Sequence, residues 1–422
     1  MSMSAPQPTV AVVESSPGAI NPSVVPFNSL RRRAAPRSAR KTGLYDLNLT
    51  DLTERVTAMG QPAYRARQIF TGAYRQMADS YDAMTDLPKA LKPQLEAELP
   101  IQLLKPVQIY ESDKGDTIKA LFQTDDGQFI ETVLMLYPDR ATVCVSCQVG
   151  CAVGCAFCAT GIGGLTRNLT TGEMVEQVIW SVRLARERGR QLTNLVMMGM
   201  GEPLQNYAAT MAFIGIINDA AGLQFGARRI TISTSGILPR ITALADEPYQ
   251  VNLAVSLHAP NDALRDKLVP HNTRYPVRDL MAVCRDYTEK TGRRISFEYA
   301  LMAGINDGDA IATELALLLR RSGVLCHVNI IPFNKVEILD FERPTPGQID
   351  RFAAVLTEHG ISTTVRYSRG LDIKAACGQL RAEHEGLVPS TPISTATRDT
   401  LPAAASIDLD GEPVPGETHV VG

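Results

Sequence analysis

The sequence predicts an α/β protein built on a parallel sheet that curls into a partial or full (β/α)6 barrel. A small N-terminal helical domain, a short β extension and disordered termini complete this prediction. From residue 141 onward, short runs rich in Val, Ile and Leu alternate with amphipathic stretches of helical period. Six such units imply a parallel sheet, and right-handed crossovers between its strands curl it. Several strands end in polar residues, which is where barrel enzymes place their chemistry.

The N-terminal part divides into a tail and a helical domain. Residues 1–42 are rich in Pro, Ala, Ser and Arg without periodicity, so we expect a disordered tail. In residues 43–103 apolar side chains recur every three or four positions, which is typical of amphipathic helices. Three helical segments are expected there: LTDLTERVTAMG, AYRARQIFTGAYRQM and LPKALKPQLEAEL.

Residues 104–140 predict the short β extension. The runs TIKALFQT and FIETVLMLY flank a polar turn, DDGQ at residues 125–128. Two alternating runs on either side of a polar turn indicate a hairpin. The run VQIYES precedes them and adds a further extended segment.

Residues 141–385 predict the barrel domain, and residues 386–422 a second disordered tail, which is acidic. The expected strands are ATVCVSCQ, NLVMMGM, RITISTSG, VNLAVSLH, RRISFEYAL and CHVNIIPF, followed later by STTVRYS. The helical stretches between them include GEMVEQVIWSVRLARERG, PVRDLMAVCRDYTEKTG and AIATELALLLRRSG. The polar residues at strand ends are Gly201-Glu202-Pro203, Ser233 to Gly236, Ser256-Leu257-His258 and Asn334.

Composition excludes few classes of protein. The chain has 422 residues, is 45% hydrophobic and carries a net charge of −3, so it is not basic overall. No run of 18 apolar residues suggests a membrane span, and the N-terminus does not resemble a secretory signal. We therefore expect a cytoplasmic protein, in which clustered cysteines more often bind metal or do redox chemistry than form structural disulfides.

Five of the eight cysteines lie in CVSCQVGCAVGCAFCATG, residues 144–161. Cys151, Cys155 and Cys158 form CxxxCxxC on the loop after the first barrel strand. A zinc site would need a fourth ligand, for which Cys147 is available, but zinc sites usually use paired CxxC units. Unligated core cysteines are a further alternative, although five so close together make it improbable. The third is an iron–sulfur cluster held by three cysteines, which leaves one iron open to a substrate or cofactor.

The motif and its context resemble the radical S-adenosylmethionine (SAM) superfamily, and Phe157 also fits, since an aromatic residue commonly precedes the last cysteine. The segments VMMGMGEPLQN, RRITISTSG, LAVSLHAPNDALRD, IPFN and AACGQL resemble one of its families more closely. This is the RlmN family, the bacterial dual-specificity methyltransferases that act on adenine C2 in 23S ribosomal RNA and transfer RNA. The resemblance covers residues 44–381. It implies two cofactors, a 4Fe-4S cluster and SAM. The amino and carboxylate groups of SAM chelate the open iron of the cluster.

The family resemblance implies a radical reaction at adenine C2, a carbon with no acidic proton that a base could remove. One SAM first methylates a cysteine, and a second is cleaved to a 5′-deoxyadenosyl radical. That radical takes hydrogen from the S-methyl group, and the resulting methylene radical adds to C2. Cys377, in AACGQL, matches the methyl-carrying cysteine. Cys144 matches the thiol that attacks the Cys377 sulfur, and Glu131, in FIETV, matches the base that removes the C2 proton from the protein–RNA adduct.

The same resemblance implies a set of cofactor-binding residues. Gly201 and Glu202 match the GGEP-type motif, which holds the ammonium group of SAM by charge-assisted hydrogen bonds. The family positions that contact the carboxylate, ribose or adenine of the cofactor are matched by Ser233, Ser256, Leu257, His258 and Asn334.

Cys147 departs from the family pattern, in which Ser or Thr is usual. It is either a harmless isostere or a thiol that pairs wrongly with Cys144 on oxidation. Cys284 and Cys326 fall in a predicted helix and a predicted strand, and both are expected in the core.

The expected partners are 23S ribosomal RNA at the peptidyl-transferase centre and transfer RNA next to the anticodon. We also expect an electron donor such as flavodoxin, and a monomer that binds no membrane. Two rival functions stay open. One is methylation at adenine C8, the Cfr type, which uses the same cysteines. The other is a zinc-stabilised RNA-binding protein without catalysis.

Overall fold

The computed structural model describes residues 42–335, 339–367 and 384. The two tails for which the sequence predicts disorder lie outside the described residues, residue 42 excepted, and so does Cys377. No helix in the described part of the chain is long and apolar enough to span a membrane.

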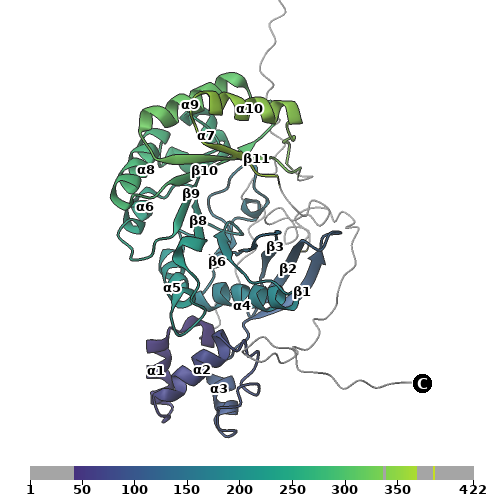
Figure 1. Ribbon diagram of the computed structural model, residues 1–422, viewed down its shortest axis with the longest axis vertical. Helices are drawn as coiled ribbons and strands as arrows, with labels where there is room; N and C mark the ends of the chain where they lie inside the picture. The colour runs from purple at the N-terminus through teal and green to yellow at the C-terminus, as the bar shows by residue number, and fades with distance from the viewer. Residues whose placement is uncertain (1–41, 336–338, 368–383, 385–422) are drawn as a thin grey trace, which may run out of the picture. The chain divides into compact units, whose positions relative to one another are not determined.

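The N-terminal helices form because each has an apolar stripe and a defined start. They are η1 (Leu44–Asp46), α1 (Leu49–Ala58), α2 (Tyr64–Tyr74) and α3 (Lys92–Glu98). Asn48 caps α1, since its side chain accepts a hydrogen bond from the Asp51 amide. The prediction of a small helical region is confirmed, and Figure 1 shows it in purple.

One continuous sheet runs through the rest of the described chain, in the order β1-β2-β3-β4-β7-β8-β9-β10-β11-β12. The strands β1 (Leu104–Glu111), β2 (Thr117–Thr124), β3 (Phe129–Leu136) and β4 (Ala141–Cys144) pair antiparallel. From β4 onward every pairing is parallel, through β7 (Asn194–Met197), β8 (Ile230–Thr234), β9 (Asn252–Ser256), β10 (Ile295–Leu301), β11 (Cys326–Pro332) and β12 (Thr363–Val365). A separate small sheet pairs β5 (Gln148–Gly150) with β6 (Leu165–Asn168).

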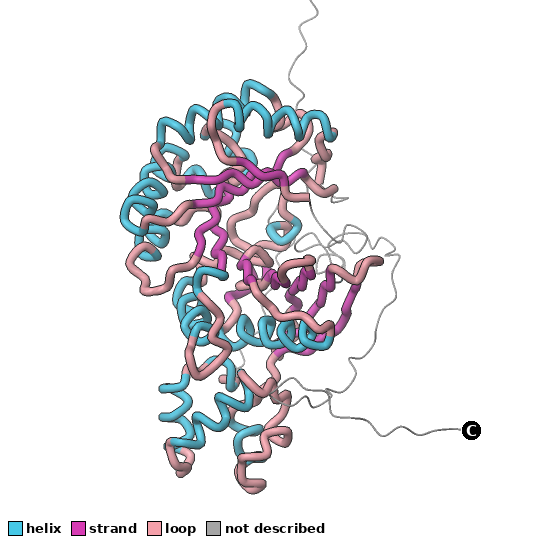
Figure 2. Tube along the Cα trace, viewed as in Figure 1, coloured by secondary structure: helices cyan, strands magenta, loops and turns pink. Residues whose placement is uncertain are grey.

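A helix follows each of the parallel strands from β4 to β11, as in a (β/α) barrel. These helices are α4 (Thr171–Glu187), α5 (Tyr207–Asn218), α6 (Leu238–Leu244), α7 (Asp262–Leu268), α8 (Val277–Thr291), α9 (Asp309–Ser322) and α10 (Pro346–Glu358). Short 3-10 helices η2 (Ala159–Gly161), η3 (Ala227–Arg229) and η4 (Pro270–Thr273) lie in the connections. Figure 2 shows the helices of the parallel region outside its strands. The predicted partial barrel is confirmed.

The predicted hairpin is also confirmed, with β2 and β3 on either side of its turn. Gly127 has a φ of +75°, which glycine adopts without strain, and its amide donates to the Thr124 carbonyl at 2.8 Å. The turn sets the register, so Lys119 faces Val133 and Leu121 faces Glu131.

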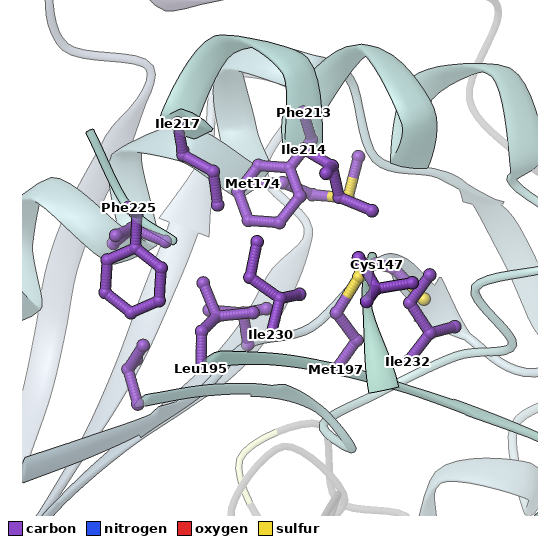
Figure 3. Close-up of a cluster of buried hydrophobic side chains, with 14 of the residues drawn as sticks. Cys147, Met174, Leu195, Met197, Phe213, Ile214, Ile217, Phe225, Ile230 and Ile232 are labelled. Carbon is purple, nitrogen blue, oxygen red and sulfur yellow. The ribbon is translucent and has the colours of Figure 1, made fainter. Parts of the chain in front are cut away.

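The two faces of the sheet differ in character. One face packs against the helices, and Figure 3 shows part of this core, where Leu195, Met197, Ile230 and Ile232 meet side chains of α4 and α5. We call the opposite face the inner face. Along β8, Ile230, Ile232 and Thr234 are buried, whereas Thr231 and Ser233 between them are half-buried. The inner face is therefore polar and partly accessible, which suits a binding site.

Candidate active site

The three CxxxCxxC cysteines share one loop between the two short strands β5 and β6. Cys151, Cys155 and Cys158 are each half-buried, and the first two pack beside a small apolar cluster that includes Val153 and Ala159. Burial raises the pKa of Cys151 to about 12 and that of Cys155 well above its usual value, and the neighbouring thiols add to both shifts. Both are therefore neutral thiols until a metal displaces their protons.

The donor set of this loop fits an iron–sulfur cluster better than zinc. The loop offers three cysteines, whereas a structural zinc site usually has four protein ligands. Three cysteines are enough for a cluster that leaves one iron open.

Cys147 cannot act as a fourth ligand, because it points into the core. It is 2% exposed and packs in the same cluster as Met197 and Ile232, as Figure 3 shows. Burial raises the pKa of its thiol well above the usual value. The zinc alternative thereby loses the fourth ligand that the sequence offered.

Glu202 links the loop after β7 to the loop after β8. Its Oε2 accepts hydrogen bonds from the amide and the hydroxyl of Ser235 at 2.7 and 2.9 Å, and its Oε1 accepts one from the Leu204 amide. Burial raises the pKa of this carboxyl, and these hydrogen bonds oppose the shift. The charge of Glu202 contributes to the raised pKa of both Cys151 and Cys155, so Glu202 lies near the cysteine loop.

Position 201 requires glycine, both because of its backbone conformation and because of its close neighbours. Its φ is +109°, and a Cβ at this position would lie 2.6 Å from the Cβ of Gln148. The Gln148 side chain in turn accepts a hydrogen bond from the Glu202 amide at 2.8 Å. The close approach therefore positions the Glu202 backbone against β5.

Ser233 and Ser256 are half-buried at the C-terminal ends of β8 and β9. Below them, the guanidinium of Arg265 is 1% exposed and donates to three carbonyls, those of Ser235, Ser256 and Leu257, at 2.6 to 3.0 Å. Arg265 thereby holds the ends of two neighbouring strands together. The backbone of Leu257 is positioned by this contact and by its own amide, which donates to the Glu298 carbonyl.

His258 is held in one tautomer. Its Nδ1 accepts a hydrogen bond from the Ala300 amide at 2.9 Å, so its other nitrogen, Nε2, carries the proton. Burial lowers the pKa of His258 to about 3, so the ring is neutral at physiological pH. Its ring contacts Phe157 edge-to-face, with 4.6 Å between centroids. His258 thus joins the strand end to the cysteine loop.

Asn334 lies just after β11 and is oriented by a residue that the sequence did not single out. Arg343 Nη1 donates to Asn334 Oδ1 at 2.9 Å, and the Arg343 guanidinium also lies 6.0 Å from the ring centroid of Tyr367. This hydrogen bond fixes the Asn334 amide oxygen as an acceptor for Arg343.

Glu131 forms a buried ion pair with Lys119. The Lys119 Nζ lies 2.9 Å from the Glu131 Oε2, and the two side chains are 0% and 2% exposed. The Glu131 carbonyl also accepts a hydrogen bond from the Ser146 hydroxyl at 2.6 Å. Both charged groups lie on the inner face, on the side of β2 and β3 that is turned away from α4.

Cys144 lies in the same cross-strand row as Lys119. Its registered partner on β3 is Val133, whose partner on β2 is Lys119, so the three side chains share the inner face. Burial raises the pKa of Cys144 to about 11, while the Met198 backbone, Arg366 and Lys119 oppose the rise. The structure therefore brings Glu131, Lys119 and Cys144 together on one face.

Cys377 lies outside the described residues, so its position is not part of this geometry. The nearest described residues on either side are Tyr367 and His384. The His384 ring packs edge-to-face on Phe129 of β3, with 4.4 Å between centroids.

The sequence singled out the segment that contains Ser235 but missed four other residues that support the site, namely Lys119, Gln148, Arg265 and Arg343. Only Lys119 carried a usable signal, because the hairpin turn sets a register that places it close to Glu131. Gln148 contacts a residue 54 positions away, and Arg265 and Arg343 bind residues of the site eight or more positions away, so none of these contacts has a local sequence pattern.

Comparison with known proteins decides the family. Residues 145–316 match the radical SAM superfamily, and residues 42–101 match the ribosomal RNA large subunit methyltransferase N-terminal domain. Two relatives are named probable dual-specificity RNA methyltransferase RlmN. The one from Chloroflexus aurantiacus is 48% identical over 85% of this chain and 96% of its own, and the one from Frankia alni is 50% identical over 85% and 86%. The chain belongs to the RlmN family.

A solved structure agrees with this membership. A radical SAM methyltransferase from Sphaerobacter thermophilus is 62% identical, with a TM-score of 0.79 over 80% of this chain and 98% of that one. The resemblance found in the motifs is confirmed, and so are the two cofactors, because radical SAM proteins use a 4Fe-4S cluster and SAM. The cysteine loop and the polar ends of β7, β8, β9 and β11 hold thiol, carboxylate, hydroxyl and amide groups, the kinds of group that can bind such cofactors.

Proposed function

We propose that this RlmN family member is a radical SAM methyltransferase that methylates adenine C2 in 23S ribosomal RNA and in transfer RNA. The relatives' names and the two matched families support RNA as the substrate. The names of the relatives favour the C2 position, and the observation that supports the mechanism is the group of Glu131, Lys119 and Cys144 on the inner face. A base and a thiol on one face are what a covalent RNA adduct needs for its release.

The cofactor-binding residues are proposed from the geometry of the strand ends. Cys151, Cys155 and Cys158 hold the cluster, which, when bound, supplies the electron that cleaves SAM to a carbon radical. Glu202 binds the ammonium group of SAM, because a buried carboxylate near the cysteine loop stabilises a cation there. The remaining polar contacts to SAM come from Gly201, Ser233, Ser256, Leu257, His258 and Asn334.

The methyl group travels on Cys377, which carries it as S-methylcysteine, so each turnover uses two SAM molecules. After its carbon has bonded to C2, the adduct radical must lose one electron, for which the cluster, when bound, would be the acceptor, and Glu131 takes the C2 proton. The Cys144 thiolate then attacks the Cys377 sulfur, so an S–S bond forms as the S–C bond breaks. The electron pair of the S–C bond passes to the released carbon, which takes a proton and becomes the methyl group. Lys119 and Arg366 favour the thiolate of Cys144, which burial disfavours.

The disulfide is reduced before the next turnover by a cellular thiol, and flavodoxin or a similar protein supplies the electron for the cluster. We place this reaction in the cytoplasm, where both RNA substrates are present, and propose that the enzyme acts as a monomer.

The test is anaerobic reconstitution followed by reaction with each RNA, with mass spectrometry of the digested nucleosides. We expect 2-methyladenosine from both substrates. Production of 8-methyladenosine instead would establish the rival Cfr-type activity.

Two variants separate the cysteine roles. Cys377→Ala should abolish methylation, and a normal rate in that variant would refute its role as methyl carrier. Cys144→Ala should accumulate a covalent protein–RNA adduct on a denaturing gel, and Cys147 cannot replace it because that thiol is buried in the core. Cys284→Ala, in the core of α8, is the matched control and should do neither.

A further inference from the structure

Glu298 is a buried carboxylate for which neither the sequence motifs nor the proposed mechanism has a task. It lies in the middle of β10. Ile295, Phe297 and Tyr299 are fully buried on the helix side, and the Tyr299 ring lies 5.2 Å from the ring of Phe352 in α10. Because side chains alternate along a strand, Glu298 points to the inner face.

This carboxylate is only half satisfied within the described chain. Its Oε1 accepts a hydrogen bond from Asn329 Nδ2 at 2.8 Å. Its Oε2 lies 3.8 Å from Arg366 Nη1, which is an ion-pair distance, and has no hydrogen-bond partner among the described residues. Glu298 is 3% exposed, and burial raises the pKa of its carboxyl while Arg366 and Asn329 oppose the shift. A buried acceptor without a donor is costly, so it indicates a donor on a ligand.

The neighbours of Glu298 belong to the SAM-binding end of the sheet. Glu298 is paired in register with Ser256, the last residue of β9, so both side chains lie on the inner face. The Leu257 amide donates to the Glu298 carbonyl at 3.0 Å. The carboxylate therefore stands at the level where β9 ends and its polar loop begins.

SAM offers three kinds of donor: its ammonium group, the amino group of adenine, and the ribose hydroxyls. Glu202, near the cysteine loop, suits the ammonium group, and Asn334 suits an adenine edge. In dinucleotide-binding folds, which are also built on parallel sheets, the ribose hydroxyls are bound by a carboxylate. We propose that Glu298 binds the ribose of SAM, with Oε2 accepting a hydrogen bond from one ribose hydroxyl.

In this arrangement Asn329 holds Oε1 and so orients the carboxylate, while the Arg366 cation favours its ionised form. The proposal rests on the binding of SAM by a radical SAM protein. It does not depend on which RNA carbon is methylated, so the proposed ribose contact and the proposed C2 methylation can each be refuted independently.

The test is equilibrium dialysis of cluster-loaded protein with SAM and with its 2′-deoxy and 3′-deoxy analogues. For the wild type, one of the two analogues should bind about ten-fold or more weakly than SAM, because a hydrogen bond to a charged group is lost. Glu298→Gln should bind SAM more weakly than the wild type by a similar factor. This variant should bind the discriminated deoxy analogue no more weakly than it binds SAM. Glu289→Gln, in the exposed part of α8, is the matched control and should bind all three ligands like the wild type.

Three results would overturn the proposal. If Glu298→Gln weakens all three ligands by the same factor while the wild type discriminates, the residue only supports the fold. If it binds SAM normally but binds RNA less tightly, its partner is the target nucleotide. If neither deoxy analogue binds more weakly to the wild type, no ribose hydroxyl is recognised, and this result requires no variant to fold.

Discussion

The buried ion pair between Lys119 and Glu131 predicts a large and specific loss of stability. Lys119→Met keeps the length of the side chain and removes its charge. The Nζ–Oε2 distance is 2.9 Å, and both side chains are almost fully buried, so the carboxylate loses a cation that water cannot replace. Removing one partner of a buried pair costs about 3–5 kcal/mol. Glu131 keeps further contacts, so we expect the lower end, about 3 kcal/mol.

Thermal unfolding measures this loss. At about 2 °C for each kcal/mol in a chain of this size, Lys119→Met should lower the midpoint by about 6 °C. The double variant Lys119→Met with Glu131→Leu should recover most of the loss, because no buried charge is then left. Lys290→Met removes a cation from an exposed pair with Asp246 and should shift the midpoint by no more than about 1 °C.

Two results would refute this reasoning. The first is a midpoint for Lys119→Met within about 2 °C of the wild type, which would mean that the pair contributes little. The second is a double variant as unstable as the single one, which would mean that packing, and not charge, causes the loss.

Three further predictions concern the cysteines and the loop after β7. Cys147→Val should keep the full iron content and methylate normally, because the Cys147 thiol packs in the core. Cys155→Ala should lose the iron–sulfur cluster and its brown colour. Iron analysis of the two variants distinguishes these outcomes. Gly201→Ala should fold less stably by about 1–3 kcal/mol in denaturant titration, because its φ of +109° and the 2.6 Å approach to Gln148 exclude a methyl group. Iodoacetamide should alkylate Cys144 slowly below pH 9, and the alkylation rate should rise toward pH 11. The reason is that burial raises the pKa of Cys144 to about 11 and only the thiolate reacts. An alkylation rate that stops rising near pH 8 would contradict this pKa.

The sequence was sufficient for the elements and their order. Alternating apolar runs identified the parallel strands, and the polar turn identified the hairpin that sets the register of Glu131. The continuity of the extension with the barrel was not predictable, because the pairing of β3 with β4 joins two regions of different texture through backbone hydrogen bonds. No residue pattern in either strand encodes that pairing.

Within the site, residues in local motifs could be predicted and their supports could not. Glu202 and His258 stand in recognisable segments at strand ends. Arg265 supports those ends from the following helix, through bonds to backbone carbonyls that any residue type supplies. The tautomer of His258 depends on the Ala300 amide, a contact that only the folded sheet creates.

The direction in which two neighbouring cysteines point has a consequence for their oxidation. Cys144 ends β4 on the inner face, whereas Cys147 is buried with Met197 and Ile232 on the helix side. A disulfide needs its two Cβ atoms about 3.5–4.5 Å apart and directed toward each other. Because the two thiols point away from each other, a bond between them requires the segment between β4 and β5 to turn over, so the packing of Cys147 in the core disfavours this one wrong pairing.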